Sequence, residues 1–98
     1  MIETLEYEYP DRQATTARAH VGAVGSGDLE VLLEPSGTNR AQVRIRTSVS
    51  GFASTWKTVL DRFFSRYDEA VRIEINDAGA TPGTVALRLE HSVEASRR

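Results

Sequence analysis

One short stretch of the sequence carries a side chain suited to covalent chemistry. Ser26 stands between Gly25 and Gly27, and Asp28 follows directly. Because glycine has no Cβ and adopts positive φ without strain, these glycines can fold the backbone sharply and leave the Ser26 hydroxyl uncovered. Alternating apolar residues follow at 29–33, which is typical of a tight turn leading into a strand. An enzyme could therefore reach this hydroxyl, although on the tetrapeptide alone an unmodified, solvated turn residue is the simpler interpretation.

The same residues make a poor hydrolytic site. Ser26 and Asp28, with His20 or His91, supply the residue types of a catalytic triad. However, Asp28 lies only two residues from Ser26, and nothing positions a histidine between them. The tip of a hairpin also excludes little water, which electrostatic catalysis requires. We interpret His20 as a surface residue of a strand and His91 as a helix side chain without a ligand-spaced partner.

Three stretches, taken in order, carry a resemblance to a known family. They are residues 24–35, 45–51 and 77–83, with the sequences VGSGDLEVLLEP, IRTSVSG and DAGATPG. Together they resemble the acyl-carrier (delta) subunit of bacterial malonate decarboxylase, over nearly the whole chain. That family is related to the carrier subunit of citrate lyase, and in both a serine in the glycine-flanked turn carries a phosphoribosyl-dephospho-CoA group. The resemblance implies that Ser26 is the attachment residue.

The function implied by this resemblance is that of a non-catalytic carrier. The implied cofactor is 2'-(5''-phosphoribosyl)-3'-dephospho-CoA on Ser26, whose thiol holds acetyl and malonyl thioesters while malonate is converted to acetate and CO2. A chain without cysteine could thus serve thioester chemistry. The implied partners are the alpha subunit (an acetyl/malonyl carrier transferase), the beta and gamma decarboxylase subunits, the phosphoribosyl-dephospho-CoA transferase and a malonyl transferase. Gly25, Gly27 and Asp28 are expected to serve recognition of the turn by the transferase that attaches the cofactor.

Two alternatives stay open at this point. The first is a citrate lyase-type carrier, although that branch tends to have serines at the modified turn and lacks a glycine pair like Gly25 and Gly27. The second is an interaction module whose hairpin docks on a partner while Ser26 is never modified. Intact mass after co-expression with the transferase separates a carrier from such a module.

Length and composition narrow the class of protein further. A chain of 98 residues fits one domain, 1–98, with a modest two-layer core. The formal net charge of −2 gives no general attraction to nucleic acid or anionic lipid. Without cysteine, disulfides and Cys-based zinc sites are excluded. Because the N-terminus is acidic where a signal peptide is basic, and no apolar run approaches about 20 residues, we expect a cytoplasmic protein without a membrane span.

Alternating apolar and polar residues predict five strands. They are expected at residues 4–9, 17–23, 29–34, 42–49 and 71–76. The second and third strands form a predicted hairpin with Ser26 at its tip. The fourth strand is expected to pair antiparallel with the third. That pairing would place Glu30 and Glu34 across from Arg44 and Arg46, in weak cross-strand charge pairs.

After Gly51 the apolar period changes to that of a helix. Between Phe52 and Tyr67 apolar and aromatic side chains recur at steps of three and four, so this helix should lie across the sheet as the main core element. Residues 82–96 fit either a strand or a helix, and Thr81 as N-cap with Pro82 in the first turn favours a helix. The predicted order β-β-β-β-α-β-α corresponds to an α+β two-layer sandwich, with two helices packed on an antiparallel-dominated sheet of about five strands.

Overall fold

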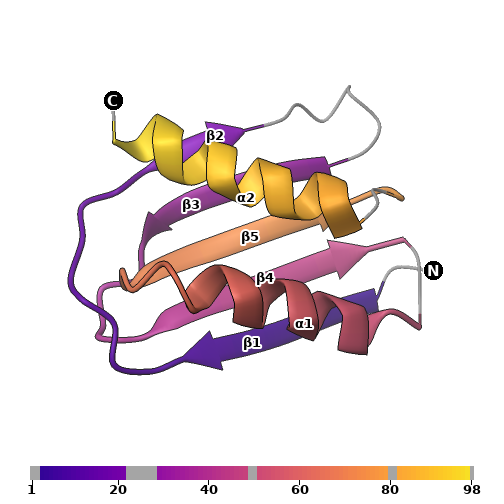
Figure 1. The fold of residues 1–98 in the computed structure, drawn as a ribbon, viewed down its shortest axis with the longest axis horizontal. Coiled ribbons are helices and arrows are strands. Elements are labelled where there is room, and N and C mark those ends of the chain that lie inside the picture. The colour runs from indigo at the N-terminus through magenta and orange to yellow at the C-terminus, as the bar shows by residue number, and fades with distance from the viewer. Residues whose placement is uncertain (1–2, 22–28, 49–50, 80–81, 98) are drawn as a thin grey trace.

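Five strands form one sheet, and two helices cover one of its faces (Figure 1). The computed structural model describes residues 3–21, 29–48, 51–79 and 82–97. In chain order the elements are β1 (Glu3–Tyr9), β2 (Ala19–Val21), β3 (Leu29–Pro35), β4 (Ala41–Thr47), α1 (Ala53–Phe64), β5 (Val71–Asp77) and α2 (Pro82–Ser96). The predicted α+β class and element order are confirmed, and the last segment, which fitted both a strand and a helix, is a helix.

The strands lie in the order β1-β4-β5-β3-β2. Three of the four neighbouring pairs are antiparallel, as predicted for most of the sheet, whereas β4 and β5 are parallel. Parallel neighbours need a long connection that carries the chain back to the starting end of the sheet. α1 provides that connection, and β5 therefore takes the central position although it is the last strand of the chain.

The predicted pairing of the fourth strand with the third is wrong, because β5 lies between them. Glu30 and Glu34 of β3 therefore do not face Arg44 and Arg46 of β4. Arg44 instead pairs with Glu6 of β1, with 3.2 Å between Arg44 Nε and Glu6 Oε1. Alternation assigns each side chain to a face of the sheet, but it does not specify which strand lies alongside.

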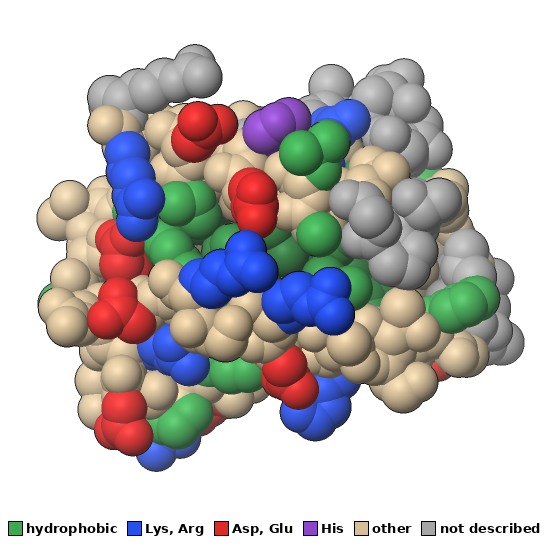
Figure 2. Space-filling model, in the orientation of Figure 1, with side chains coloured by type: hydrophobic (Ala, Val, Ile, Leu, Met, Phe, Trp, Pro, Cys, Tyr) green, Lys and Arg blue, Asp and Glu red, His purple; other side chains and the backbone are tan. Residues whose placement is uncertain are grey.

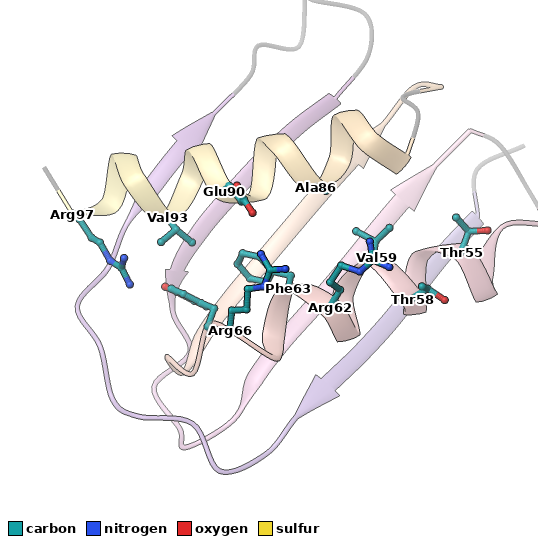
Figure 3. A pocket seen from close by; sticks show the side chains of 11 residues that line it. Thr55, Thr58, Val59, Arg62, Phe63, Arg66, Ala86, Glu90, Val93 and Arg97 are labelled. Atoms are coloured by element: carbon teal, nitrogen blue, oxygen red, sulfur yellow. The ribbon is translucent and has the colours of Figure 1, made fainter.

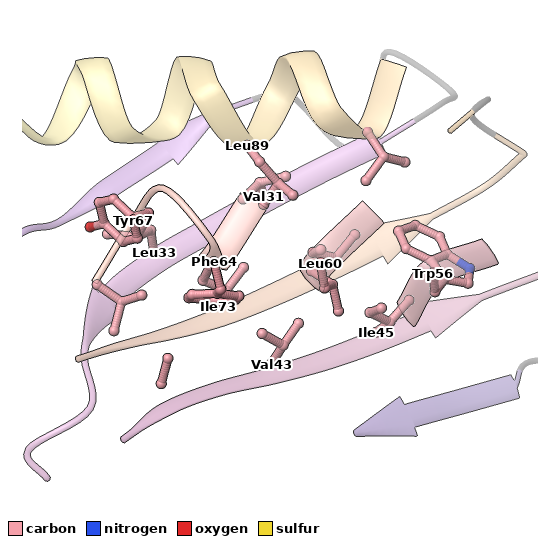
Figure 4. Packing of buried hydrophobic residues seen from close by; sticks show 14 of the residues in the cluster. Val31, Leu33, Val43, Ile45, Trp56, Leu60, Phe64, Tyr67, Ile73 and Leu89 are labelled. Atoms are coloured by element: carbon pink, nitrogen blue, oxygen red, sulfur yellow. The ribbon is translucent and has the colours of Figure 1, made fainter. Parts of the chain in front are cut away.

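The hydrophobic core lies between the sheet and the two helices (Figure 4). Trp56, Leu60 and Phe64 of α1 are buried on one helical face. Val85 and Leu89 of α2 are at most 1% exposed. The strands contribute alternate residues, among them Val31, Leu33, Val43, Ile45, Ile73 and Ile75. The inward faces predicted for β3, β4 and β5 are thereby confirmed.

α1 is shorter than the predicted helix at both ends. It begins at Ala53, and Phe52 is 49% exposed instead of belonging to the core. Tyr67 lies beyond the last helical residue, Phe64, yet its side chain is buried. The Arg12 guanidinium donates hydrogen bonds to the backbone oxygens of Phe64 (2.8 Å) and Tyr67 (3.0 Å). The first bond satisfies the carbonyl group of the last helical residue, which no intrahelical donor follows, and the second holds the chain just beyond the helix.

α2 lies over β2 and β3, the two strands that flank the predicted site (Figure 1). Ser92 is fully buried on its inner face, where the hydroxyl donates to the Leu89 backbone oxygen at 2.6 Å. Thr81, the predicted N-cap, lies outside the described residues. No helix in the described part of the chain is long and apolar enough to cross a bilayer.

Candidate functional site

The strands on either side of the predicted site are well placed in the sheet. The site residues themselves lie outside the described ranges: Gly25, Ser26, Gly27 and Asp28. β2 ends at Val21 and β3 begins at Leu29. The two strands are antiparallel neighbours, with Val21 opposite Val31. The predicted pairing of the second strand with the third is confirmed, and it brings the two ends of segment 22–28 to the same end of the sheet.

The three stretches that carry the family resemblance meet at this end of the sheet. In the register of the strands, Leu29 of β3 lies opposite Asp77 of β5. Asp77 in turn lies opposite Thr47 of β4. Each of these residues belongs to a different one of the three stretches. A single row across neighbouring strands therefore joins segments that are far apart in the sequence.

Asp77 is the polar centre of that row. Its side chain is 8% exposed and accepts hydrogen bonds from the Thr47 hydroxyl at 2.7 Å and from the Gly79 backbone nitrogen at 3.1 Å. The Asp77 backbone oxygen accepts a further bond from the Ser48 nitrogen at 3.1 Å. Gly79 adopts φ of 110°, a left-handed conformation that favours glycine. Asp77 thus holds the chain leaving β4 and the chain leaving β5 against each other, next to the start of β3.

Sequence reasoning missed this role of Asp77. In the sequence-based predictions, residues 77–83 carry part of the family resemblance and Asp77 has no structural role. The signal that could have revealed it is the Asp-x-Gly spacing of Asp77 and Gly79, since an aspartate often accepts a hydrogen bond from the backbone two residues on. The contact with Thr47 could not be inferred, because it depends on the parallel pairing of β4 with β5.

A second polar group joins three strands on the face of the sheet that the helices leave open. His20 Nε2 of β2 lies 2.8 Å from Glu30 Oε2 of β3, and Asn76 Nδ2 of β5 donates to Glu30 Oε1 at 2.9 Å. The hydrogen bond with His20, and next the one from Asn76, lower the pKa of the Glu30 carboxyl below its usual value. Glu30 therefore stays ionised and links β2, β3 and β5 near the start of β3.

The two histidines are far apart in their positions in the fold. The His20 side chain is 56% exposed on the open face of the sheet, as expected of a surface residue, but it has a carboxylate partner that the sequence did not predict. His91 is exposed on α2, which covers the opposite face. Within the described ranges, no group of three His, Asp or Glu side chains could hold a metal ion.

The comparisons with known proteins agree with one another. The family model for the malonate decarboxylase delta subunit matches residues 16–96. The malonate decarboxylase acyl carrier proteins of Azotobacter vinelandii and Pseudomonas fluorescens Pf-5 are 48% and 49% identical to this chain over 94 residues, which is 95% of each chain. These relatives belong to the malonate branch that the Gly25 and Gly27 pair favoured over the citrate branch.

A solved structure is similar in fold as well as in sequence. A chain from the crystal structure of a Pseudomonas malonate decarboxylase hetero-tetramer in complex with malonate matches this structure with a TM-score of 0.85 and 49% identity. The match covers 94% of this chain and 96% of that one. This chain therefore belongs to the malonate decarboxylase acyl carrier family, the delta subunits, which are carriers and not catalytic subunits.

Proposed function

We propose that this chain is the acyl carrier of a malonate decarboxylase complex and that Ser26 bears the 2'-(5''-phosphoribosyl)-3'-dephospho-CoA group. The observation that carries the proposal is the similarity to delta subunits over 95% of the chain, in a sequence that has the Gly-Ser-Gly-Asp turn. The meeting of the three family stretches at the sheet end beside segment 22–28 supports it further.

The chemistry of the chain's own residues fits such a group. Attachment requires one open hydroxyl of the carrier, and glycines on both sides of Ser26 leave its hydroxyl without neighbouring Cβ atoms. Val21, which lies opposite Val31, and Leu29, which lies opposite Asp77, anchor both ends of the segment in the sheet. When bound, the group supplies the thiol that the cysteine-free chain lacks.

Attachment is a single displacement at phosphorus. Ser26 Oγ attacks the α-phosphorus of triphosphoribosyl-dephospho-CoA, and an O–P bond to the serine forms. The P–O bond to the terminal diphosphate breaks, diphosphate leaves, and the hydroxyl proton passes to a base of the transferase. Gly25, Gly27 and Asp28 serve recognition of the turn by that transferase.

The proposed partners follow from this role. They are the alpha subunit, which exchanges acetyl for malonyl on the carrier, the beta and gamma decarboxylase subunits, the phosphoribosyl-dephospho-CoA transferase and the malonyl transferase. The chain acts in the cytoplasm under this proposal, because reducing conditions keep the thiol of the arm free.

Co-expression with the phosphoribosyl-dephospho-CoA transferase and its triphosphate-forming enzyme tests the proposal. The wild-type chain should gain the mass of one arm, and Ser26→Ala should gain none and should support no malonate decarboxylation in the reconstituted complex. Ser54→Ala removes an exposed hydroxyl at the start of α1 and is the matched control. An unchanged wild-type mass would mean that the chain is an unmodified interaction module.

A further inference from the structure

A groove of about 550 Å³ runs between α1 and α2 on the helix-covered side of the molecule (Figure 3). Its apolar lining consists of half-buried side chains of both helices, including Val59, Phe63 and Val93. From Thr55 to Phe63, the lining residues of α1 span about 12 Å, which is the length of roughly two helical turns. The groove therefore has the size and the apolar lining of a binding site.

The charged side chains of the groove are mostly cationic, although the whole chain has a formal charge of −2. Arg62, Arg66 and Arg97 line it against one acid, Glu90. Among the described residues no carboxylate forms an ion pair with Arg62 or Arg66, while Arg97 Nη2 lies 3.4 Å from Glu69 Oε2. Figure 2 shows basic side chains along the middle of this face, beside exposed apolar surface. The groove thus attracts an anionic occupant.

A buried hydroxyl gives a second indication of an occupant. Tyr67 lines the groove and is 5% exposed, and among the described residues its hydroxyl makes no hydrogen bond of good geometry. Burial raises the pKa of this phenol, as do the charge of nearby Glu69 and a weak hydrogen-bond interaction with that carboxylate, so the phenol remains a donor. The Arg97 guanidinium lies over the ring, 6.0 Å from its centroid. Because a buried donor without a well-formed hydrogen bond is unfavourable, an oxygen acceptor that reaches it stabilises the bound state.

The composition of the groove is that of a protein interface. Arginine, tyrosine and phenylalanine are enriched at the centres of such interfaces, where they act as anchors. A channel between two helices also accepts an amphipathic helix, which places its apolar side chains in the groove. We propose that the α1–α2 groove docks a helix of another malonate decarboxylase subunit, one that presents Asp or Glu beside apolar residues to Arg62 and Arg66. This inference rests on the proposed function, since it takes its partner from the complex.

The position of the groove suits a carrier. None of its lining residues belongs to β2 or β3, the strands that flank segment 22–28. Docking through the helices thus leaves the sheet end at which β2 ends and β3 begins available for exchange with the active sites. A carrier held in this way stays at high effective concentration near every site that it serves.

A pair of charge reversals tests the docking surface. The remaining subunits are purified without the carrier, and the affinity of the full-length carrier for them is measured by calorimetry at about 0.1 M and about 0.5 M NaCl. Arg62→Glu/Arg66→Glu should weaken binding about 100-fold and lose most of the salt dependence. The matched control is Arg44→Glu/Arg46→Glu on the opposite face of the sheet, whose affinity should stay within about threefold of the wild type.

A variant that is expected to bind more tightly controls for misfolding. Glu90→Arg removes the acid of the groove and should tighten binding about tenfold, which an unfolded chain cannot do. Equal affinity of wild type and Arg62→Glu/Arg66→Glu, or equal losses in both double variants, would overturn the proposal. The proposal would also be overturned if attachment of the prosthetic group to the free carrier changed the amide chemical shifts along α1 and α2. The prosthetic group itself would then occupy the groove.

The proposed function is checked separately from the groove. The wild-type mass after co-expression with the transferase comes first. A chain that gains no mass refutes the carrier role whatever the affinities are. A chain that gains the mass but binds the other subunits without any contribution from Arg62 and Arg66 refutes the groove alone.

Discussion

The hydroxyl of Thr47 donates to the carboxylate of Asp77 across the boundary between β4 and β5, with 2.7 Å between Oγ1 and Oδ2. Both side chains are buried, at 1% and 8% exposure. Thr47→Val keeps the shape of the side chain but leaves a carboxylate oxygen without this donor. We expect a loss of about 1 to 3 kcal/mol in the free energy of unfolding. At about 4 to 8 °C per kcal/mol, the fall in melting temperature should be easily measured.

Thr4→Val is the matched control for this prediction. Thr4 lies on the exposed face of β1, so the same substitution should change stability by no more than about 0.5 kcal/mol. Equal melting temperatures of Thr47→Val and the wild type would show that the Thr47–Asp77 contact does not stabilise this end of the sheet.

Two neighbouring phenylalanines on α1 should respond differently to truncation. Phe64 is 2% exposed and stacks on Tyr9, with 4.4 Å between the ring centroids, whereas Phe63 is only half-buried at the edge of the α1–α2 groove. Phe64→Ala should cost about 3 to 5 kcal/mol. Phe63→Ala should lower the free energy of unfolding by only about 1 to 2 kcal/mol, because the Phe63 side chain buries less apolar area than that of Phe64. Urea titrations of both variants measure the difference, and an equal loss would contradict the assigned core face.

The sequence was sufficient to predict the elements and their faces. Val43 and Ile45 alternate with polar residues, and both are buried as predicted. The spacing of Val85 and Leu89 fitted both a strand and a helix, and the helix that Thr81 and Pro82 favoured has both residues on its inner face. Periodicity reports which side of an element is apolar, and that property is local.

Contacts between strands could not be predicted in the same way. Glu34 was expected to face the arginines of β4, but it pairs with Arg72 of β5, with 2.9 Å between Arg72 Nε and Glu34 Oε1. That pairing exists because the β4-α1-β5 connection inserts β5 beside β3. The partner of a charged strand residue is thus set by topology, and no local pattern in β3 encodes it.

In the candidate site, too, one residue could be assigned from local sequence and another could not. The assignment of Ser26 depends on a turn motif and on the family resemblance, both of which are local in sequence. The role of Asp77 depends on its contact with Thr47, which lies on another strand and 30 residues earlier in the chain. Only the three-dimensional structure could reveal that contact.

The hydrogen bonds to Glu30 predict an effect of acid on stability. They lower the pKa of Glu30 from its usual value of 4.5. A carboxyl whose pKa is lower in the folded state stabilises the fold above the unfolded value, and this contribution disappears as the pH falls through the folded value. The wild type should therefore lose stability between about pH 5 and pH 3, and Glu30→Gln should lose less.

Melting temperatures of both proteins across this range measure the effect. The difference between wild type and Glu30→Gln should shrink as the pH falls, because both side chains are then neutral. His20→Ala removes the first of the two hydrogen bonds. Its melting temperature should therefore also fall less than that of the wild type as the pH is lowered. If the melting temperatures of wild type and Glu30→Gln changed equally with pH, Glu30 would have the same pKa in the folded and unfolded chains.

Asp28 follows Ser26, the proposed attachment residue, and its role can be separated from that of the turn itself. An aspartate at this position either accepts a backbone hydrogen bond within the turn or supplies charge near the incoming phosphates, and the capping role is the simpler one. Asp28→Asn retains an oxygen acceptor and removes the charge. We expect this variant to be modified at a near-normal rate, whereas Asp28→Ala, which lacks the acceptor, should be modified more slowly.

The rate of mass gain with purified transferase measures both variants, and thermal melting checks that each is folded. Gly27→Ala provides a comparison: if the turn requires positive φ at this position, alanine adds a strain of about 1 kcal/mol, which is small against a total stability of about 5 to 15 kcal/mol. It should therefore slow modification while the melting temperature changes little. A collapse of the rate in Asp28→Asn, with an unchanged melting temperature, would contradict the capping role and assign the charge of Asp28 to the attachment reaction.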